Sequence, residues 1–290
     1  MRRTMLFLPG NSPNMIANGS FLGADSIILD LEDAVSPDNK DAARNLVKSA
    51  LKHLTFGTCE VIVRINSLDT PYWEIDLEEV VPYHPDVIMP TKVSDCLTIE
   101  LLVEKLDTLE QKCGLEIGSV KLLPLIETAL GLEHAYSIAS SSKRIVGLLL
   151  GAEDLTADLR CERTKEGREI EYARGRLVNA ARAAGVEPYD CPFTAIADPE
   201  GLAVDTMLAK SLGFSGKAVI NPRHVSRVNE IFSPTTGEIE YAKNVFAAIE
   251  EAGKLGKGAI SLNGKMIDAP IVQRAKLVLE AARALEGVNT

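Results

Sequence analysis

The sequence predicts an α/β protein, a (β/α)8 TIM barrel with a hairpin and a helix appended at its carboxyl end. Eight short apolar segments precede residue 221, and longer segments of helical spacing separate most of them. These apolar segments are continuously hydrophobic rather than alternating, which is typical of parallel strands covered on both faces. A doubly wound sheet is the alternative, but the first strand lacks the GxGxxG turn that would favour it.

The expected strands and helices follow in a regular order. The strands cover residues 5–8, 26–31, 61–65, 86–89, 121–126, 145–150, 189–193 and 218–220. The spacing of apolar residues predicts helices over residues 40–54, 96–112, 169–184 and 200–212. Boundary signals agree, because Ser36-Pro37-Asp38 precedes the first of these helices and Gly185 follows the third.

The segment after the eighth unit differs from the barrel pattern. Residues 238–254 predict a long surface helix, and Asn263-Gly264 between two short strand-like runs predicts a β-hairpin. Pro270 suits the first turn of a closing helix over residues 271–285. We therefore expect a catalytic barrel domain over residues 1–232. The extension over residues 233–290 would then pack on its own barrel or on a neighbouring subunit.

Composition excludes several classes of protein. The net charge of −10 argues against a general nucleic-acid surface, which needs clustered Lys and Arg. No apolar run approaches the roughly 18 residues of a membrane span, and the short apolar stretch after Arg2-Arg3 is no signal peptide. The five cysteines are scattered and form no CxxC pair, as in reduced cytosolic proteins. We expect a cytoplasmic protein that binds neither nucleic acid nor a membrane.

Acidic residues stand at the expected carboxyl ends of several strands, where barrels build their active sites. Glu32 and Asp33 follow the second strand, Glu127 ends the fifth, and Asp154 follows the sixth. Glu127 and Asp154 lie on neighbouring strands and would repel each other unless a cation lay between them. The four histidines have no zinc-like spacing, so the candidate ion is Mg²⁺. The alternative is that these acids only cap helices or face solvent.

Two further features of the strand ends suggest anion binding. Arg64 interrupts the apolar segment VIVRIN, either as a salt-bridge partner of the acids after the second strand or as a forked donor for a substrate carboxylate. Gly151 and Ala152 follow the sixth strand, and their small size would let backbone N–H groups approach an anion closely.

Several segments together carry a resemblance to a known family. They are RTMLFLPGN, GADSIILDLEDAVSP, VIVRINSLDTPYW, LLPLIETALG, LLLGAEDLTADL, KAVINPRHV and SLNGKMIDAPIV. In this order they resemble the citrate lyase/malyl-CoA lyase family of HpcH/HpaI aldolase-type barrels, and within it the citrate lyase β subunits. The resemblance implies a homo-oligomer (a trimer or hexamer), Mg²⁺ held by Glu127 and Asp154, and Arg64 and Glu127 close to the substrate.

The resemblance also implies a reaction, the Mg²⁺-dependent cleavage of citryl thioester into oxaloacetate and acetyl thioester. The substrate would be carried by an acyl carrier protein or by CoA, and other citrate lyase subunits would be partners. In related lyases an Asp of the carboxyl-terminal segment reaches the active site of an adjacent subunit, and Asp268 matches it. We take Asp268 as the acid–base residue, with Glu32 or Asp33 as alternatives. Otherwise Asp268 is simply an acid at the start of the last helix.

Two other functions stay open. A stand-alone lyase for malyl-CoA or citramalyl-CoA would use the same metal site with a different acyl pocket. A non-catalytic barrel acting as a binding subunit would leave the site acids idle, although convergent acids usually mark function. Arg3, Lys92 and Arg223 are candidates for contacts to carrier phosphates, and ordinary solvated charges are the simpler interpretation.

Overall fold

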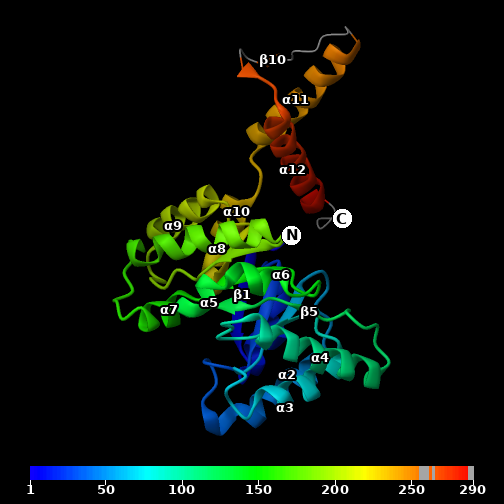
Figure 1. Cartoon of the computed structure of the whole chain (residues 1–290), viewed down its shortest axis with the longest axis vertical. Helices are drawn as coiled ribbons and strands as arrows, with labels where there is room; N and C mark the ends of the chain where they lie inside the picture. Colours follow the sequence, from blue (N-terminus) through cyan, green and yellow to red (C-terminus); the bar gives the residue numbers. More distant parts are fainter. Residues whose placement is uncertain (255–260, 263–264, 287–290) are drawn as a thin grey trace. The chain divides into compact units, whose positions relative to one another are not determined.

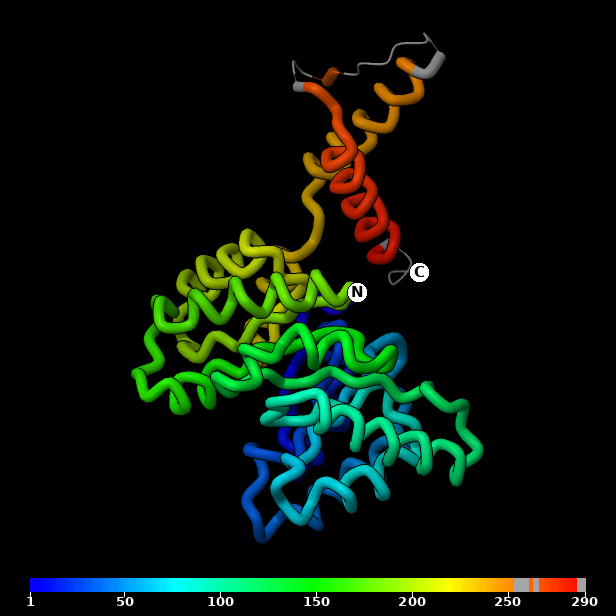
Figure 2. The backbone as a smooth tube through the Cα atoms, viewed as in Figure 1, coloured from blue at the N-terminus to red at the C-terminus, as the bar shows by residue number. Residues whose placement is uncertain are grey.

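The computed structural model describes residues 1–254, 261–262 and 265–286, and it divides into two compact units. The first unit comprises residues 2–229, and the second comprises Met1 and residues 230–290. Figures 1 and 2 trace the chain through both. The assignment of a catalytic domain to residues 1–232 and an extension to residues 233–290 stays a prediction.

The first unit contains nine short strands that pair only in parallel. They are β1 (Thr4–Pro9), β2 (Ser26–Asp30), β3 (Glu60–Arg64), β4 (Val87–Met89), β5 (Lys121–Leu122), β6 (Leu125–Ile126), β7 (Gly147–Leu150), β8 (Glu187–Asp190) and β9 (Gly216–Val219). Their hydrogen-bonded order is β5-β4-β3-β2-β1-β9-β8-β7-β6.

The sheet closes on itself because β5 and β6 are halves of one strand. Only Leu123 and Pro124 separate them, and Pro124 has no N–H to donate into a ladder. β5 pairs with β4 on one side and meets Ile145 through a parallel bridge at Leu122 on the other, while β6 pairs with β7. The two ends of the sheet are therefore the same strand, and the predicted (β/α)8 barrel is confirmed.

Helices surround these strands (Figure 1). They are α1 (Pro13–Asn18), α2 (Lys40–His53), α3 (Trp73–Val80), α4 (Cys96–Cys113), α5 (Ala129–Glu133), α6 (Ala135–Ser140), α7 (Ala152–Asp158), α8 (Glu171–Ala183), α9 (Pro199–Leu212) and α10 (Pro222–Phe232). The four helices that the sequence predicted in this unit are α2, α4, α8 and α9. The seventh strand was misplaced, because the apolar residues Cys191-Pro192-Phe193 follow β8 instead of forming it. Pro192 cannot donate a ladder hydrogen bond.

The barrel interior is filled by inward-facing side chains from all around the sheet. They are Met5, Ile28, Ile62, Val87, Met89, Leu123, Leu125, Leu149, Tyr189 and Ala218. Outside the barrel, a buried ionic cluster joins β8 and β9 to α8 and α9. The Lys217 ammonium lies 2.5 Å from Asp190 and 2.7 Å from Asp205, and Arg174 pairs with both acids. Two positive and two negative charges therefore balance within this buried cluster.

The second unit contains two long helices and a short antiparallel pair of strands. Its elements are α11 (Thr236–Lys254), β10 (Ser261–Leu262), β11 (Lys265–Met266) and α12 (Ala269–Glu286). The strand pair is the expected hairpin, whose turn residues Asn263 and Gly264 lie outside the described residues. Ala242, Val245 and Ala275 form a small core between α11 and α12. Among the described residues of the two units, no helix combines the length and the hydrophobicity that a membrane span requires.

Candidate functional site

A pocket of about 330 Å³ lies at the carboxyl ends of the barrel strands. Its polar lining includes Asp30, Asp33 and Arg64, and its apolar wall includes Phe7 and Leu149. Gly151, Ala152 and Glu153 line the same pocket. The structure thus brings the predicted strand ends to one mouth, as parallel strands in a barrel require.

Arg64 ends β3 and is held by Asp30 at the end of β2. The Nε and Nη2 atoms of Arg64 lie 2.7 and 2.5 Å from the two carboxylate oxygens of Asp30, a bidentate pair. Its Nη1 atom lies 3.1 Å from Glu32 Oε2, and its guanidinium stacks 4.9 Å from the centre of the Phe7 ring. Burial disfavours the charge, but the hydrogen bonds and charges of the acids outweigh it and raise the Arg64 pKa. The salt bridge therefore fixes a guanidinium that lines the pocket.

Glu127 and Asp154 approach each other from adjacent strand ends. Glu127 follows β6, is only 4% exposed, and accepts the backbone N–H of Lys92 at 2.7 Å. Asp154 lies in the first turn of α7, and its side chain is about one-third exposed. Burial first, and then the negative charge of Asp154, raise the pKa of Glu127 to about 8. Two oxygen donors that repel each other in this way suit a hard cation such as Mg²⁺.

Gly151 lies against Glu127, and its lack of a side chain affects the acid pair. Its N–H donates to Ile126 O at 2.9 Å within the sheet, and its contact with a substrate anion stays a prediction. A Cβ atom at Gly151 would lie 2.6 Å from Glu127 Cβ and 2.7 Å from Glu127 Oε2. The missing side chain makes room for the Glu127 carboxylate. Ala152 begins α7, where N–H groups lack intrahelical acceptors, and stays a proposed substrate contact.

Glu32 and Asp33, the alternative acid–base residues, lie at the same mouth. Glu32 is buried, accepts the N–H of Asp33 at 2.9 Å and lies between Arg64 and Lys92. Burial raises the pKa of Glu32. Asp33 is exposed and lines the pocket.

Lys40 and Asn66 hold the loop that carries these acids, a role that no sequence pattern indicated. The Lys40 ammonium is buried and donates to Leu31 O at 2.8 Å and to Glu32 O at 2.7 Å. The Asn66 side chain donates to Leu31 O at 3.0 Å and to Asp76 at 2.7 Å. Both fix the backbone that precedes Asp33.

Lys92 was interpreted as a solvated charge or a phosphate contact, and the structure places it among acids. Its Nζ atom lies 3.2 Å from Glu32 Oε1 and 3.7 Å from Asp154 Oδ2. Lys92 follows β4, which neighbours the fifth strand, the strand that Glu127 ends. Its position at this neighbouring strand end is the sequence feature that could have predicted a place beside the acids. Arg3, another phosphate candidate, pairs with Asp25 at 2.7 Å.

Asp268 belongs to the second unit, where it caps α12. It is exposed, and its Oδ1 atom accepts the N–H of Ile271 at 3.1 Å. This contact matches the simpler interpretation of Asp268 as an acid at the start of the last helix. Its acid–base role stays a prediction.

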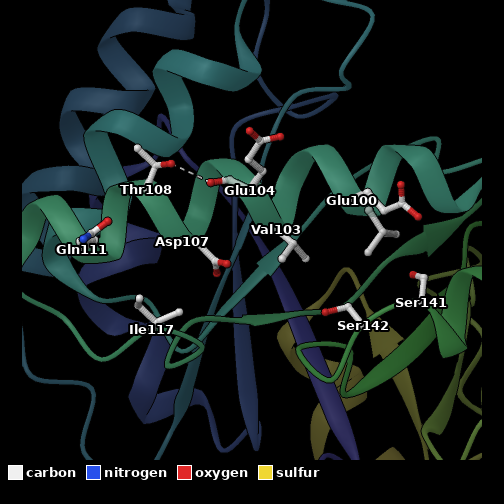
Figure 3. A pocket seen from close by; sticks show the side chains of 10 residues that line it. Glu100, Val103, Glu104, Asp107, Thr108, Gln111, Ile117, Ser141 and Ser142 are labelled. Carbon is white, nitrogen blue, oxygen red and sulfur yellow. Dashed lines mark hydrogen bonds between the residues drawn. The ribbon is translucent and has the colours of Figure 1, made fainter.

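A second pocket, of about 390 Å³, lies between α4 and the segments that precede β5 and β7 (Figure 3). Acidic residues of α4, Glu100, Glu104 and Asp107, line it together with Ile117 and Ser142. Asp107 is paired with Arg144. This groove lies at the amino ends of its neighbouring strands and has an acidic lining, so it does not suit an anionic substrate.

Comparison with known proteins places these features in a family. The sequence model of the HpcH/HpaI aldolase/citrate lyase family matches residues 3–222. A citrate lyase subunit beta of Leuconostoc mesenteroides subsp. cremoris is 45% identical over 98% of this chain and 94% of its own length. A mitochondrial citramalyl-CoA lyase of Rattus norvegicus is 33% identical over 98% of this chain and 87% of its own.

A solved structure shares both the fold and part of the sequence. The protein CitE from Mycobacterium tuberculosis, in complex with magnesium, acetoacetate and coenzyme A, superposes with a TM-score of 0.78 at 28% identity. The match covers 97% of this chain and 98% of that one. The resemblance seen in the sequence is thereby confirmed, and the chain belongs to the HpcH/HpaI aldolase/citrate lyase family.

Proposed function

We propose that this member of a lyase family is the β subunit of a citrate lyase, which cleaves citryl thioester into oxaloacetate and an acetyl thioester. The observation that carries this function is the Glu127–Asp154 pair, whose charges interact at the barrel mouth beside Arg64, which Asp30 holds and which lines the pocket there. The 45% identity to a citrate lyase subunit beta favours the citryl substrate over the malyl or citramalyl one, since the citramalyl-CoA lyase is 33% identical.

Glu127 and Asp154 would hold a Mg²⁺ ion, and the chemistry of the two carboxylates fits it. Each offers hard oxygen ligands, and the burial and repulsion that raise the pKa of Glu127 are relieved by a cation. When bound, the ion stabilises negative charge on substrate oxygens. The CitE structure from Mycobacterium tuberculosis contains magnesium, which supports the same ion here.

The chain's own residues then bind and orient the substrate. In the reaction the β-hydroxyl loses its proton, the carbon–carbon bond breaks, and the electron pair passes to the α-carbon of the thioester, which is then protonated. Arg64 presents donors to a substrate carboxylate from a position fixed by Asp30 and Phe7. The apolar wall, including Leu149, excludes water from the reacting carbons.

An acid–base residue must take and return the proton, and we assign this to Asp268 from a neighbouring copy in a homo-oligomer. Asp268→Asn is expected to lower kcat at least about 100-fold while the Kd for Mg²⁺ stays unchanged. Asparagine still accepts the N–H of Ile271, so the cap of α12 is kept. Wild-type turnover in the variant would remove Asp268 from the mechanism and leave Glu32 or Asp33 as the base.

The proposed metal site predicts that Mg²⁺ binding depends on pH. Because the pKa of Glu127 is raised to about 8, its carboxyl group is mostly protonated at neutral pH in the metal-free protein. Mg²⁺ needs the carboxylate, so binding releases a proton and the Kd falls as the pH rises from about 6 to about 8, then levels off. Isothermal titration calorimetry in two buffers of different ionisation enthalpy measures both effects. A Kd that is constant over this range would contradict the raised pKa.

The function is tested by a coupled assay for oxaloacetate with citryl, malyl and citramalyl thioesters, each with and without Mg²⁺. We expect Mg²⁺-dependent release of oxaloacetate from citryl thioester, with acyl carrier protein or CoA as the carrier. Glyoxylate from malyl-CoA or pyruvate from citramalyl-CoA would instead favour the stand-alone lyases. No cleavage of any of them, with no Mg²⁺ binding, would support a non-catalytic barrel.

A further inference from the structure

Lys92 adopts a backbone conformation that lysine rarely takes. Its φ is +53°, in the left-handed region that favours Gly or Asn. Its N–H donates to Glu127 Oε1 at 2.7 Å, a bond that a glycine could make equally well. A lysine in a strained position indicates that its side chain contributes something there.

The Lys92 side chain reaches two further acids of the mouth, Glu32 and Asp154. Its Nζ atom lies 3.2 Å from Glu32 Oε1 and 3.7 Å from Asp154 Oδ2, and these carboxylates raise the pKa of the ammonium. Together with the backbone bond to Glu127, Lys92 therefore contacts three carboxyl groups of the mouth. Glu32 has Arg64 as a second cationic partner, whereas Lys92 is the cation paired with Asp154 among the ion pairs of the described residues.

A contact between Lys92 and a carrier phosphate would need this arrangement to be broken. The ammonium already faces two carboxylates, and a third lies at its backbone N–H. A phosphate beside Nζ would be repelled by the negative charges of Glu32 and Asp154. The surroundings of Lys92 select cations rather than anions.

We propose that Lys92 is an internal counter-cation that holds Glu32 and Asp154 in place before the metal ion binds and that Mg²⁺ displaces from Asp154. This inference rests on the metal site of the proposed function. An ammonium and a divalent ion cannot share the same face of one carboxylate without repulsion. Lys92 thus keeps three acids together in the metal-free protein and, as a consequence, weakens Mg²⁺ binding.

The variant Lys92→Met tests this by Mg²⁺ titration calorimetry of the full-length chain. Removing the positive charge is expected to lower the Kd for Mg²⁺ at least about threefold, with the difference shrinking at high salt. Without Mg²⁺ the variant should melt at a lower temperature than wild type, and saturating Mg²⁺ should remove most of that difference. Lys92→Gly, which also relieves the positive φ, is expected to lower the Kd equally and serves if the Met variant does not fold.

Lys105→Met is the matched control. The Lys105 ammonium also bridges two carboxylates, Glu74 at 3.1 Å and Glu78 at 2.6 Å, but on the outer surface of α4 and α3. Its loss should leave the Kd unchanged. If wild type binds Mg²⁺ and the Lys92 variants bind it equally or more weakly, the inference about Lys92 is wrong and the proposed metal site is unaffected. If wild type binds no Mg²⁺, the metal site of the proposed function fails and the inference falls with it.

Discussion

Glu127→Gln is expected to abolish Mg²⁺ binding and to lower lyase turnover at least about 1,000-fold. Glutamine has nearly the same shape, and its side-chain oxygen can still accept the N–H of Lys92. Only the negative charge is lost, and that charge is half of the proposed ligand pair. The variant therefore separates the charge of residue 127 from its packing.

Stability should change in the opposite direction from activity. Since burial and Asp154 raise the pKa of Glu127 to about 8, its ionised form destabilises the metal-free fold above that pH. The stabilising contribution of the protonated carboxyl is complete below its unfolded-state pKa and is lost as the pH rises through about 8. Metal-free Glu127→Gln should thus unfold with a free energy about 5 kcal/mol higher than wild type at about pH 9, and equal to it at about pH 4.

All three effects can be measured on one preparation. Calorimetry measures Mg²⁺ binding, the oxaloacetate assay measures turnover, and denaturant unfolding measures stability. Glu110→Gln is the matched control, because Glu110 is also buried but is paired with Arg144, which lowers its pKa to about 2. That variant should lose stability and keep its affinity for Mg²⁺. Wild-type Mg²⁺ affinity in Glu127→Gln would show that Glu127 is no metal ligand.

The sequence predicts the barrel well because its signal is local and repeated. Each strand is a short apolar run, and each run lies close to a helix boundary marked by Gly, Pro, Ser or Asp. The exceptions occur where proline interrupts a run. Pro124 divides the fifth strand into β5 and β6, and Pro192 leaves the sheet although its neighbours are apolar. A pattern of hydrophobic residues does not show where a proline removes the backbone N–H group that a strand would need.

The sequence predicts only part of the candidate site, for a different reason. Strand-end acids and Arg64 are visible because barrel topology brings strand ends together. Lys92 is not, since its role depends on a loop conformation that turns its ammonium toward Glu32 and Asp154. Alternation along an extended chain would direct Glu153 and Asp154 to opposite sides, yet both lie in the first turn of α7. Helical geometry separates them instead, with the Glu153 carboxylate 3.6 Å from Arg163.

Gly151→Ala is expected to reduce kcat about 100-fold and to weaken Mg²⁺ binding, because the added Cβ atom must displace the Glu127 side chain. That atom would lie 2.6 Å from Glu127 Cβ and 2.7 Å from Oε2, closer than real contacts allow. The matched control is Gly175→Ala, which places a methyl group in open space on α8 and raises helix propensity. It should leave both kcat and the Kd for Mg²⁺ unchanged.

The same variant separates the two explanations for a glycine at position 151. Alanine retains the backbone N–H, so if Gly151 only donated to a substrate anion, Mg²⁺ binding without substrate would be unaffected. If the missing side chain makes room for Glu127, the Kd for Mg²⁺ must rise in the substrate-free protein. The N–H already donates to Ile126 O at 2.9 Å, which favours the second explanation. An unchanged Mg²⁺ affinity in Gly151→Ala would show that the Glu127 carboxylate shifts without cost to the metal site.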